Sequence, residues 1–182
     1  MADRRTYGVV TAAYWVFTLT DGALRTLVLL HFHRLGFSAV ELAFLFLLYE
    51  VMGVLTNLVG GWLGARFGLR LTLLAGLVVQ IAALLMLSAV RAEWAVPLSV
   101  AWVMGSQALS GVAKDLTKMS AKSSVKLVAG GGEGVLFRWV ALLTGSKNAL
   151  KGVGFIIGGV LLEMVGFRLG LWVMAGALLL TL

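Results

Sequence analysis

The sequence predicts an all-α membrane protein, and its composition, low charge and apolar runs indicate this. Of its 182 residues, 60% are hydrophobic and 13% are charged, and the mean hydropathy is +1.00. A soluble domain is about 45–50% apolar and about 25% charged. The apolar residues also gather into runs of about 20 residues, the length that a helix needs to cross a bilayer. We therefore expect six membrane-spanning helices.

The six helices are expected at about residues 9–32, 38–63, 71–90, 95–114, 135–162 and 167–182. The first follows Arg4 and Arg5 but is too long for a signal peptide, so we expect an uncleaved helix. The fourth has the only proline, Pro97, near its start, where a helix tolerates it. The sixth is short and reaches Leu182 without a polar flank, so we expect a truncated helix in the first half of a longer protein. No convincing internal repeat is visible, although three-helix repeats can exist without visible identity.

The long polar connection, at about 115–134, contains a lysine-rich stretch and the glycine-rich run AGGGEG. Cytoplasmic segments of membrane proteins carry an excess of Lys and Arg. If the N-terminus is cytoplasmic, the inner segments hold Arg4, Arg5, Arg66, Arg70, Lys118, Lys122, Lys126 and, at the edge, Arg138. The outer segments then hold only Arg34, Arg91 and Arg168. We therefore expect an integral membrane protein with a cytoplasmic N-terminus and a cytoplasmic basic segment.

Polar residues lie near the middle of each of the five complete runs. They are Asp21 and Arg25 in the first, Glu50 in the second, Gln80 in the third, Gln107 in the fourth, and Lys147 and Lys151 in the fifth. A charge at the bilayer centre costs about 3 kcal/mol or more, so such residues need partners or a water-filled cavity. The common depth predicts that these side chains meet in one layer.

Two interpretations of this layer stay open. In the structural one, Asp21 and Arg25 pair at i,i+4 spacing, and Glu50 pairs with Lys147 or Lys151. In the functional one, the single cation in excess of the carboxylates favours an anion site. The substrate-binding candidates are then Arg25, Lys147, Lys151, Gln107 and Asn57. Carboxylates in membrane helices can relay protons, so Asp21 and Glu50 are proton-coupling candidates.

Lysines recur every four residues from Lys114 through Lys118 and Lys122 to Lys126, a slowly winding basic stripe. This pattern favours a helix extension that touches anionic lipid headgroups. The alternative is a basic vestibule that gathers an anionic substrate. His31 and His33 lie near the outer end of the first helix and are interpreted as interfacial residues rather than metal ligands. The chain has no cysteine, which excludes disulfides and a thiolate metal site.

The segment GWLGARFGLR, residues 61–70, resembles the loop signature of the major facilitator superfamily, roughly G-x-x-x-D-R-x-G-R-R. The matching positions are Gly61, Arg66, Gly68 and Arg70. Ala65 stands where the signature has its acid, and Leu69 replaces one basic residue. Without its context, the segment is equally typical of a tight glycine turn with cytoplasmic charges. The run GVGFIIGG, residues 152–159, is similar to the superfamily's fifth-helix glycine motif without its proline.

Four segments together resemble the ArsJ-type organoarsenical efflux permeases. They are YWVFTLTDGALRTLVLLHFHRLGF, YEVMGVLTNLVGGWLGARFG, QALSGVAKDLTKMSAKSSVKL and LTGSKNALKGVGFIIGG. The resemblance implies the N-terminal half of a twelve-helix major facilitator fold with a truncated sixth helix. It also implies export of the anion 1-arseno-3-phosphoglycerate, which a glyceraldehyde-3-phosphate dehydrogenase makes in the cytoplasm from arsenate. Arsenate resistance would follow.

The expected partners are therefore this anion, the lipid bilayer, the dehydrogenase and a C-terminal half, with no cofactor, metal, nucleic acid or enzymatic activity. The first alternative is a major facilitator carrier for another organic anion, such as a sugar phosphate. A remote alternative is a membrane-embedded phosphotransferase, because DGALR is similar to the D-G-x-x-A-R opening of the CDP-alcohol enzymes. Its spacing is one residue short, and no second carboxylate pair follows. The third alternative is a membrane receptor or assembly subunit that does not transport.

Overall fold

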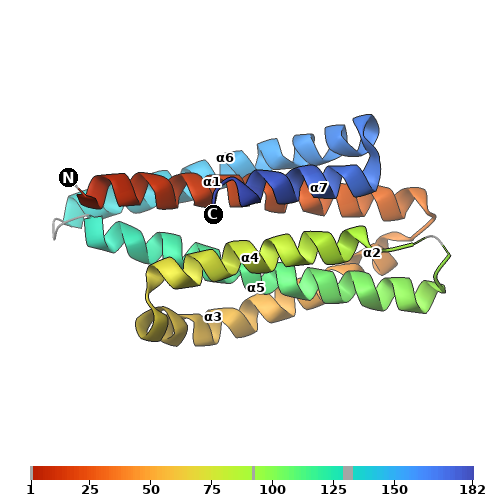
Figure 1. Ribbon diagram of the computed structural model, residues 1–182, viewed down its shortest axis with the longest axis horizontal. Coiled ribbons are helices and arrows are strands. Elements are labelled where there is room, and N and C mark those ends of the chain that lie inside the picture. Colours follow the sequence, from red (N-terminus) through yellow and green to blue (C-terminus); the bar gives the residue numbers. More distant parts are fainter. Residues whose placement is uncertain (1, 92, 129–132) are drawn as a thin grey trace.

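The computed structural model describes residues 2–91, 93–128 and 133–182, and all its elements are helices. They are α1 (Ala2–Arg34), α2 (Ala39–Leu45), α3 (Leu47–Phe67), α4 (Leu69–Ser88), α5 (Val96–Val128), α6 (Glu133–Met164) and α7 (Gly166–Leu179). The long helices lie side by side in an elongated bundle (Figure 1). The prediction of an all-helical chain is confirmed.

Three helical stretches of the described residues are long and apolar enough to cross a membrane. The first is Ala39–Phe67, which comprises α2 and α3 together. The others are Leu69–Ser88, which is α4, and Val96–Ser124, which lies within α5. Helices α1 and α6 have 33 and 32 residues, which is enough length to span a bilayer. Their polar residues, including two charges near the middle of each, lower their mean hydropathy. Helix α7 is apolar but has only 14 residues.

The helices alternate in direction, so the connections gather at two ends of the bundle (Figure 1). The N-terminus, the α3–α4 turn and the C-terminal end of α5 lie at one end. The connections after α1, α4 and α6 lie at the other end, which carries Arg34, Arg91 and Arg168. The basic residues assigned to opposite sides of the membrane are therefore at opposite ends of the molecule.

The second expected helix, 38–63, is divided at Phe46 into α2 and α3. Helix α2 begins with a capping box, in which the Ser38 hydroxyl accepts from the Glu41 amide and the Glu41 carboxylate accepts from the Ser38 amide. No proline or glycine marks the break at Phe46, so the local sequence does not indicate it. Helix α3 then ends later than expected, at Phe67. The next residue, Gly68, has a φ of +80°, which favours glycine, and it turns the chain into α4.

The fourth expected helix, 95–114, continues beyond residue 114, as the helix extension favoured by the lysine spacing predicts. Helix α5 continues to Val128, so most of the expected polar connection at 115–134 is helix. No glycine or proline interrupts residues 112–128, and a helix can therefore continue through them. Part of the glycine-rich run, residues 129–132, lies outside the described residues.

Glycines permit the closest helix crossings. A Cβ on Gly22 of α1 would lie 2.6 Å from the Lys151 carbonyl oxygen of α6, and one on Gly158 would collide with the Ala23 carbonyl. At the crossing of α3 and α5, a Cβ on Gly111 would collide with the Tyr49 carbonyl. Small residues let helix backbones approach closely, as is common within membranes. These crossings bring α1 against α6 and α3 against α5.

The helix contacts follow an approximate two-fold pattern. The pattern appears when α1 is matched with α5, α3 with α6, and α4 with α7. Under this matching, the contact between α1 and α6 corresponds to the contact between α5 and α3. The same matching converts α4–α5 into α7–α1 and leaves α1–α5 and α4–α7 unchanged, and all of these contacts are present. Because consecutive helices alternate in direction, the two units, α1–α3–α4 and α5–α6–α7, have inverted orientations. The α5–α6 contact has no α1–α3 counterpart of similar extent in the described part of the chain, so the correspondence between the two units is partial.

Candidate functional site

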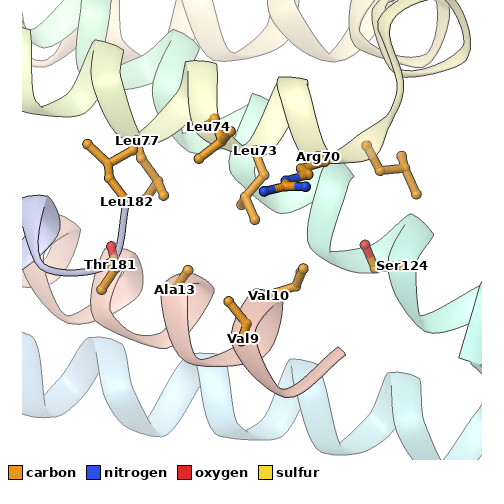
Figure 2. Close-up of a pocket in the computed structure, with 11 residues that line it drawn as sticks. Val9, Val10, Ala13, Arg70, Leu73, Leu74, Leu77, Ser124, Thr181 and Leu182 are labelled. Atoms are coloured by element: carbon orange, nitrogen blue, oxygen red, sulfur yellow. The ribbon is translucent and has the colours of Figure 1, made fainter. Parts of the chain in front are cut away.

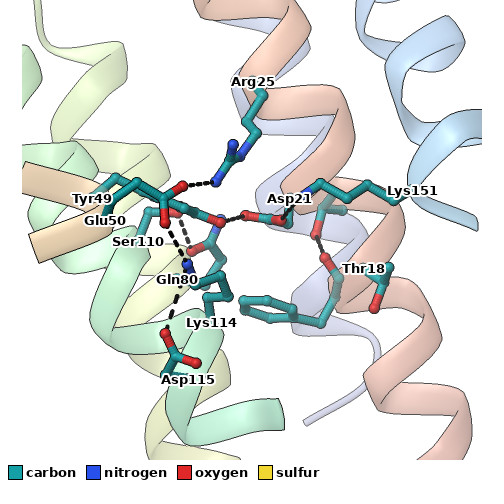
Figure 3. A network of polar contacts seen from close by, with 12 residues as sticks. Thr18, Asp21, Arg25, Tyr49, Glu50, Gln80, Ser110, Lys114, Asp115 and Lys151 are labelled. Atoms are coloured by element: carbon teal, nitrogen blue, oxygen red, sulfur yellow. Dashed lines mark hydrogen bonds and ion pairs between the residues drawn. The ribbon is translucent and has the colours of Figure 1, made fainter. Parts of the chain in front are cut away.

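Charged side chains from α1, α3, α5 and α6 meet partway along the bundle (Figure 3). We call this set the polar layer, and it consists of Asp21, Arg25, Tyr49, Glu50, Lys114, Asp115, Lys118, Lys147 and Lys151. The glycine crossings place these helices close enough for side chains from different helices to share partners.

Glu50 of α3 lies between two cations from other helices. Its Oε1 is 2.7 Å from Nη2 of Arg25, and its Oε2 is 3.3 Å from Nζ of Lys114. Both cations also lie over the Tyr49 ring, with Arg25 Cζ 4.1 Å and Lys114 Nζ 4.2 Å from its centroid. The ring therefore offers a cation–π surface that holds both cations beside the carboxylate.

Asp21 is the buried acceptor of the layer. Its side chain is only 6% exposed, its Oδ1 accepts a 2.6 Å hydrogen bond from the Tyr49 hydroxyl, and its Oδ2 is 3.5 Å from Lys151 Nζ. A buried carboxylate without such partners would be costly. Tyr49 therefore connects α1 to α3, while Lys151 connects α1 to α6.

Asp115 extends the layer along α5. Its Oδ1 is 2.9 Å from Lys118 Nζ and its Oδ2 is 3.6 Å from Lys114 Nζ, while its side chain is 3% exposed. Lys114 thus bridges a buried carboxylate of its own helix and the exposed carboxylate of Glu50.

Four lysines line a small, partly open cavity of about 40 Å³, which we call the lysine cavity. Its lining is Tyr14, Phe17, Thr18, Asp21, Lys114, Lys118, Lys147 and Lys151. One water needs about 10–15 Å³, whereas pockets for whole drug-sized ligands are about 300–1,000 Å³. The cavity is therefore large enough for one oxyanion group or a few waters, and too small for a whole organic anion.

The polar layer carries an excess of positive charge. Its five cations, Arg25 and four lysines, face the three carboxylates of Asp21, Glu50 and Asp115. Within the part of the chain that the structure describes, Lys147 makes no ion pair although it lines the cavity. A set of residues that only neutralised itself would not need this surplus, which would attract an anion.

The structural interpretation of the polar layer predicted the wrong ion-pair partners. Among the described residues no ion pair joins Asp21 to Arg25, despite their i,i+4 spacing; Arg25 instead reaches α3 to bind Glu50. Glu50 does not pair with Lys147 or Lys151 in this same set of residues. The packing of α1 directs Asp21 and Arg25 toward different neighbours.

The expected polar residues of α3, α4 and α5 have different surroundings. Gln107 and Gln80 are fully buried, and Gln80 accepts a 2.8 Å hydrogen bond from Ser110. Both amide atoms of Gln107 lack a hydrogen-bond partner among the described residues. Asn57 is exposed two turns along α3 from Glu50, on the same helix face. Neither Gln107 nor Asn57 lines the lysine cavity, and their role as substrate ligands stays a prediction.

The loop-motif residues lie at the end of the bundle that holds the N-terminus. Arg66 packs over Trp62, with Cζ 5.2 Å from the ring centroid, and Gly61 is exposed beside Met119. Arg70 lines a larger, mostly apolar cavity of about 590 Å³ between α1, α4 and the end of α7 (Figure 2). The motif therefore forms a tight Gly68 turn with exposed basic side chains.

The remaining basic residues fall into two groups. Lys114 and Lys118 belong to the polar layer, whereas Lys122 is exposed farther along α5. The side chain of Lys126 lies outside the described part of the chain. His31 stacks on Phe167 with ring centroids 3.9 Å apart, and His33 is exposed. The basic stripe thus begins inside the site rather than beside it.

Sequence reasoning missed Tyr49, Lys114, Asp115 and Lys118 as members of the layer. The fourth helix was expected to end at residue 114, which assigned these α5 residues to the cytoplasm. The available signal was the lack of a helix breaker in KDLTKMSAKSSVKL, together with the i,i+3 and i,i+4 spacing of Asp115 and Lys114 to Lys118. Tyr49 carried no signal, because aromatic residues are common in apolar helices.

The described part of the chain is all-helical, has three stretches long and apolar enough to cross a membrane, and carries a small cationic cavity between α1, α5 and α6. Within the described ranges, no group of three or more histidine, aspartate and glutamate side chains could hold a metal ion. No protein-family model matches the chain, and no curated protein matches it.

Proposed function

We propose that this chain is the N-terminal half of a major facilitator transporter that exports an organic anion from the cytoplasm. The observation that carries this proposal is the lysine cavity inside the bundle, which is formed by three helices, α1, α5 and α6. Ionisable residues inside membrane helices usually mark substrate or ion pathways, because burying them without a function is costly. Surplus cations around a cavity suit a substrate with phosphate-like groups.

The packing pattern supports the transporter class. Inverted three-helix repeats are nested within each half of major facilitator transporters, and substrate sites lie near the bilayer midplane between repeats. The exchange of α1, α3 and α4 with α5, α6 and α7 preserves the main helix contacts here, although among the described residues α5–α6 has no α1–α3 counterpart of similar extent, and α1 and α5 both line the cavity. The distribution of basic residues between the two ends favours an N-terminus in the cytoplasm of a bacterial inner membrane.

The particular substrate that we propose is 1-arseno-3-phosphoglycerate, supplied by a glyceraldehyde-3-phosphate dehydrogenase acting with arsenate. Its support is the resemblance of four sequence segments to the ArsJ-type permeases. The cavity adds compatible chemistry, since one phosphate or arsenate group matches its size and charge. Arsenate resistance would be the result of export.

A second candidate is a carrier of another organic anion, such as a sugar phosphate. Lysine side chains act as point charges and recognise oxyanions generally, so the cavity by itself does not select arsenic. Competition between unlabelled sugar phosphates and the arsenical in one transport assay separates the two candidates.

The test is arsenic accumulation in everted membrane vesicles. They contain the full-length protein, because in this fold the second half supplies the other wall of the cavity. The dehydrogenase and arsenate generate the ester outside the vesicles. We expect accumulation that requires the dehydrogenase and is lost in Arg25→Ala and Lys147→Ala at equal protein level. Arg91→Ala is the matched control, because this exposed arginine lies in the connection after α4, outside the polar layer and the basic stripe. No accumulation with folded protein would refute the arsenical assignment.

A further inference from the structure

Glu50 holds the position that an anionic ligand would take between Arg25 and Lys114. Its two carboxylate oxygens are divided between the two cations, at 2.7 and 3.3 Å. A carboxylate or phosphate from solution would make the same two contacts. The arrangement in Figure 3 therefore contains an oxyanion site that is already occupied by a side chain of the protein.

The carboxylate is more exposed than the cations it contacts. The Glu50 side chain is 59% exposed, whereas those of Arg25 and Lys114 are 27% and 22% exposed. A side chain with so few contacts in the described part of the chain can rotate away with little loss of packing. Glu50 can therefore leave this site, while the two cations stay partly enclosed.

The cations keep other contacts when Glu50 leaves. Tyr49 has no exposed surface, and its hydroxyl is fixed by the hydrogen bond to Asp21. Its ring lies beneath both cations, and Lys114 is also 3.6 Å from the Asp115 carboxylate. The two-cation site is thus held by groups other than Glu50, so it would still be formed once the carboxylate had moved.

We infer that Glu50 is a tethered competitor of the substrate. Its carboxylate fills the oxyanion site of Arg25 and Lys114 when the transporter is empty, and an arriving anionic group displaces it. This inference rests on the proposed function, since it names residues that select an oxyanion in the polar layer beside the lysine cavity. The exchange of one carboxylate for another anion leaves the charge contacts of both cations satisfied. It also weakens substrate binding, which helps release, because a transported solute must leave as well as enter.

The test compares binding of two probes, 3-phosphoglycerate and inorganic phosphate, to purified full-length protein by isothermal titration calorimetry. We expect Glu50→Gln to lower the Kd of 3-phosphoglycerate by about fivefold, the scale on which an exposed ion pair competes. Glu163→Gln is the matched control. Glu163 also forms an exposed ion pair, with Arg34 at 2.6 Å, but lies at the far end of α6. Its substitution should leave the Kd unchanged.

Two further variants test the mechanism. Glu50→Asp keeps the charge but shortens the side chain, so it should lower the Kd less than Glu50→Gln does. Adding Lys114→Gln to Glu50→Gln should remove the gain, because one of the two cations is then missing. The Kd of inorganic phosphate should rank the variants in the same order if the site recognises an oxyanion rather than the whole phosphoglycerate.

A Kd that is unchanged or raised in Glu50→Gln, with normal elution and thermal stability, overturns the inference. If Glu50→Gln does not fold, an unchanged or raised Kd in Glu50→Asp overturns it instead. The vesicle assay tests the proposed function separately. Tighter binding in Glu50→Gln without arsenical accumulation in vesicles supports the tethered carboxylate and refutes only the arsenical substrate. Accumulation in vesicles without any gain in binding refutes only the role of Glu50.

Discussion

The Tyr49 hydroxyl donates a 2.6 Å hydrogen bond to the buried carboxylate of Asp21, and this bond links α3 to α1. Tyr49 also supplies the ring beneath Arg25 and Lys114. One side chain therefore connects the Asp21–Lys151 pair to the Arg25–Glu50–Lys114 group. This position makes Tyr49 the residue through which the two parts of the polar layer are coupled.

Tyr49→Phe keeps the ring and removes only the donor. We expect a loss of about 1–3 kcal/mol in stability, because a buried carboxylate loses a hydrogen bond. The measurement is the melting temperature of the purified protein in detergent. The loss should be smaller in an Asp21→Asn background, since contacting residues are not additive. Equal losses in both backgrounds would contradict the direct coupling.

Gly158→Ala should destabilise the contact between α1 and α6. The added Cβ would collide with the Ala23 carbonyl, which belongs to the backbone and cannot rotate away. Overpacking of this kind costs about 1–3 kcal/mol. Gly152→Ala on the same helix is the control, because its Cβ would have no neighbour within 4 Å. We expect thermal stability to fall in the first variant only, and a similar fall in both would refute the close crossing.

Gln107→Leu should leave thermal stability unchanged or raise it. Its fully buried amide lacks hydrogen-bond partners among the described residues, and an unpaired buried polar group costs about 1–3 kcal/mol. Gln80→Leu should instead lower stability, because it removes the acceptor of the buried Ser110 hydroxyl. Thermal unfolding of both variants in detergent checks this order. If Gln107→Leu lowers stability and also abolishes transport, Gln107 has a role that its surroundings do not indicate.

Substitution of Lys147 and substitution of Lys151 should change thermal stability differently. Lys151→Met removes the cation 3.5 Å from Asp21 and should lower thermal stability. Lys147→Met removes a cation that has no ion pair among the described residues and lies among other lysines, so stability should hold or rise. Both variants should lose vesicle transport. A Lys147→Met protein that is stable and fully active would refute the assignment of this lysine to the substrate.

The depth of the charged residues could be predicted from the sequence, but their partners could not. Asp21, Arg25, Glu50, Lys147 and Lys151 were placed near the middle of their runs by counting residues, and the structure brings all of them into one layer. The i,i+4 spacing favoured an Asp21–Arg25 pair, because local spacing is all that one helix provides. The actual partners come from α3 and α6.

The position of the α5 lysines is a second property that the local sequence does not determine. Lysines at 114 and 118 looked cytoplasmic, since positive charges after an apolar run usually mark its end. The helix continues past them, and its contacts with α1, α3 and α6 bring both side chains to the cavity. Hydropathy describes the solvent that a segment prefers on average, and it does not register a charge that a neighbouring helix neutralises.

The sequence by itself determined the helical class, the presence of stretches apolar enough to cross a membrane, and the common level of the charges along the helices. These properties follow from composition and from the rise of a helix per residue, which are local. Only the tertiary structure decided that Arg25 binds Glu50, that Asp21 binds Tyr49 and Lys151, and that the lysines share one cavity. These outcomes depend on how each helix is rotated about its own axis. That rotation is set by which glycines face a neighbouring backbone, and it exists only after the helices have packed.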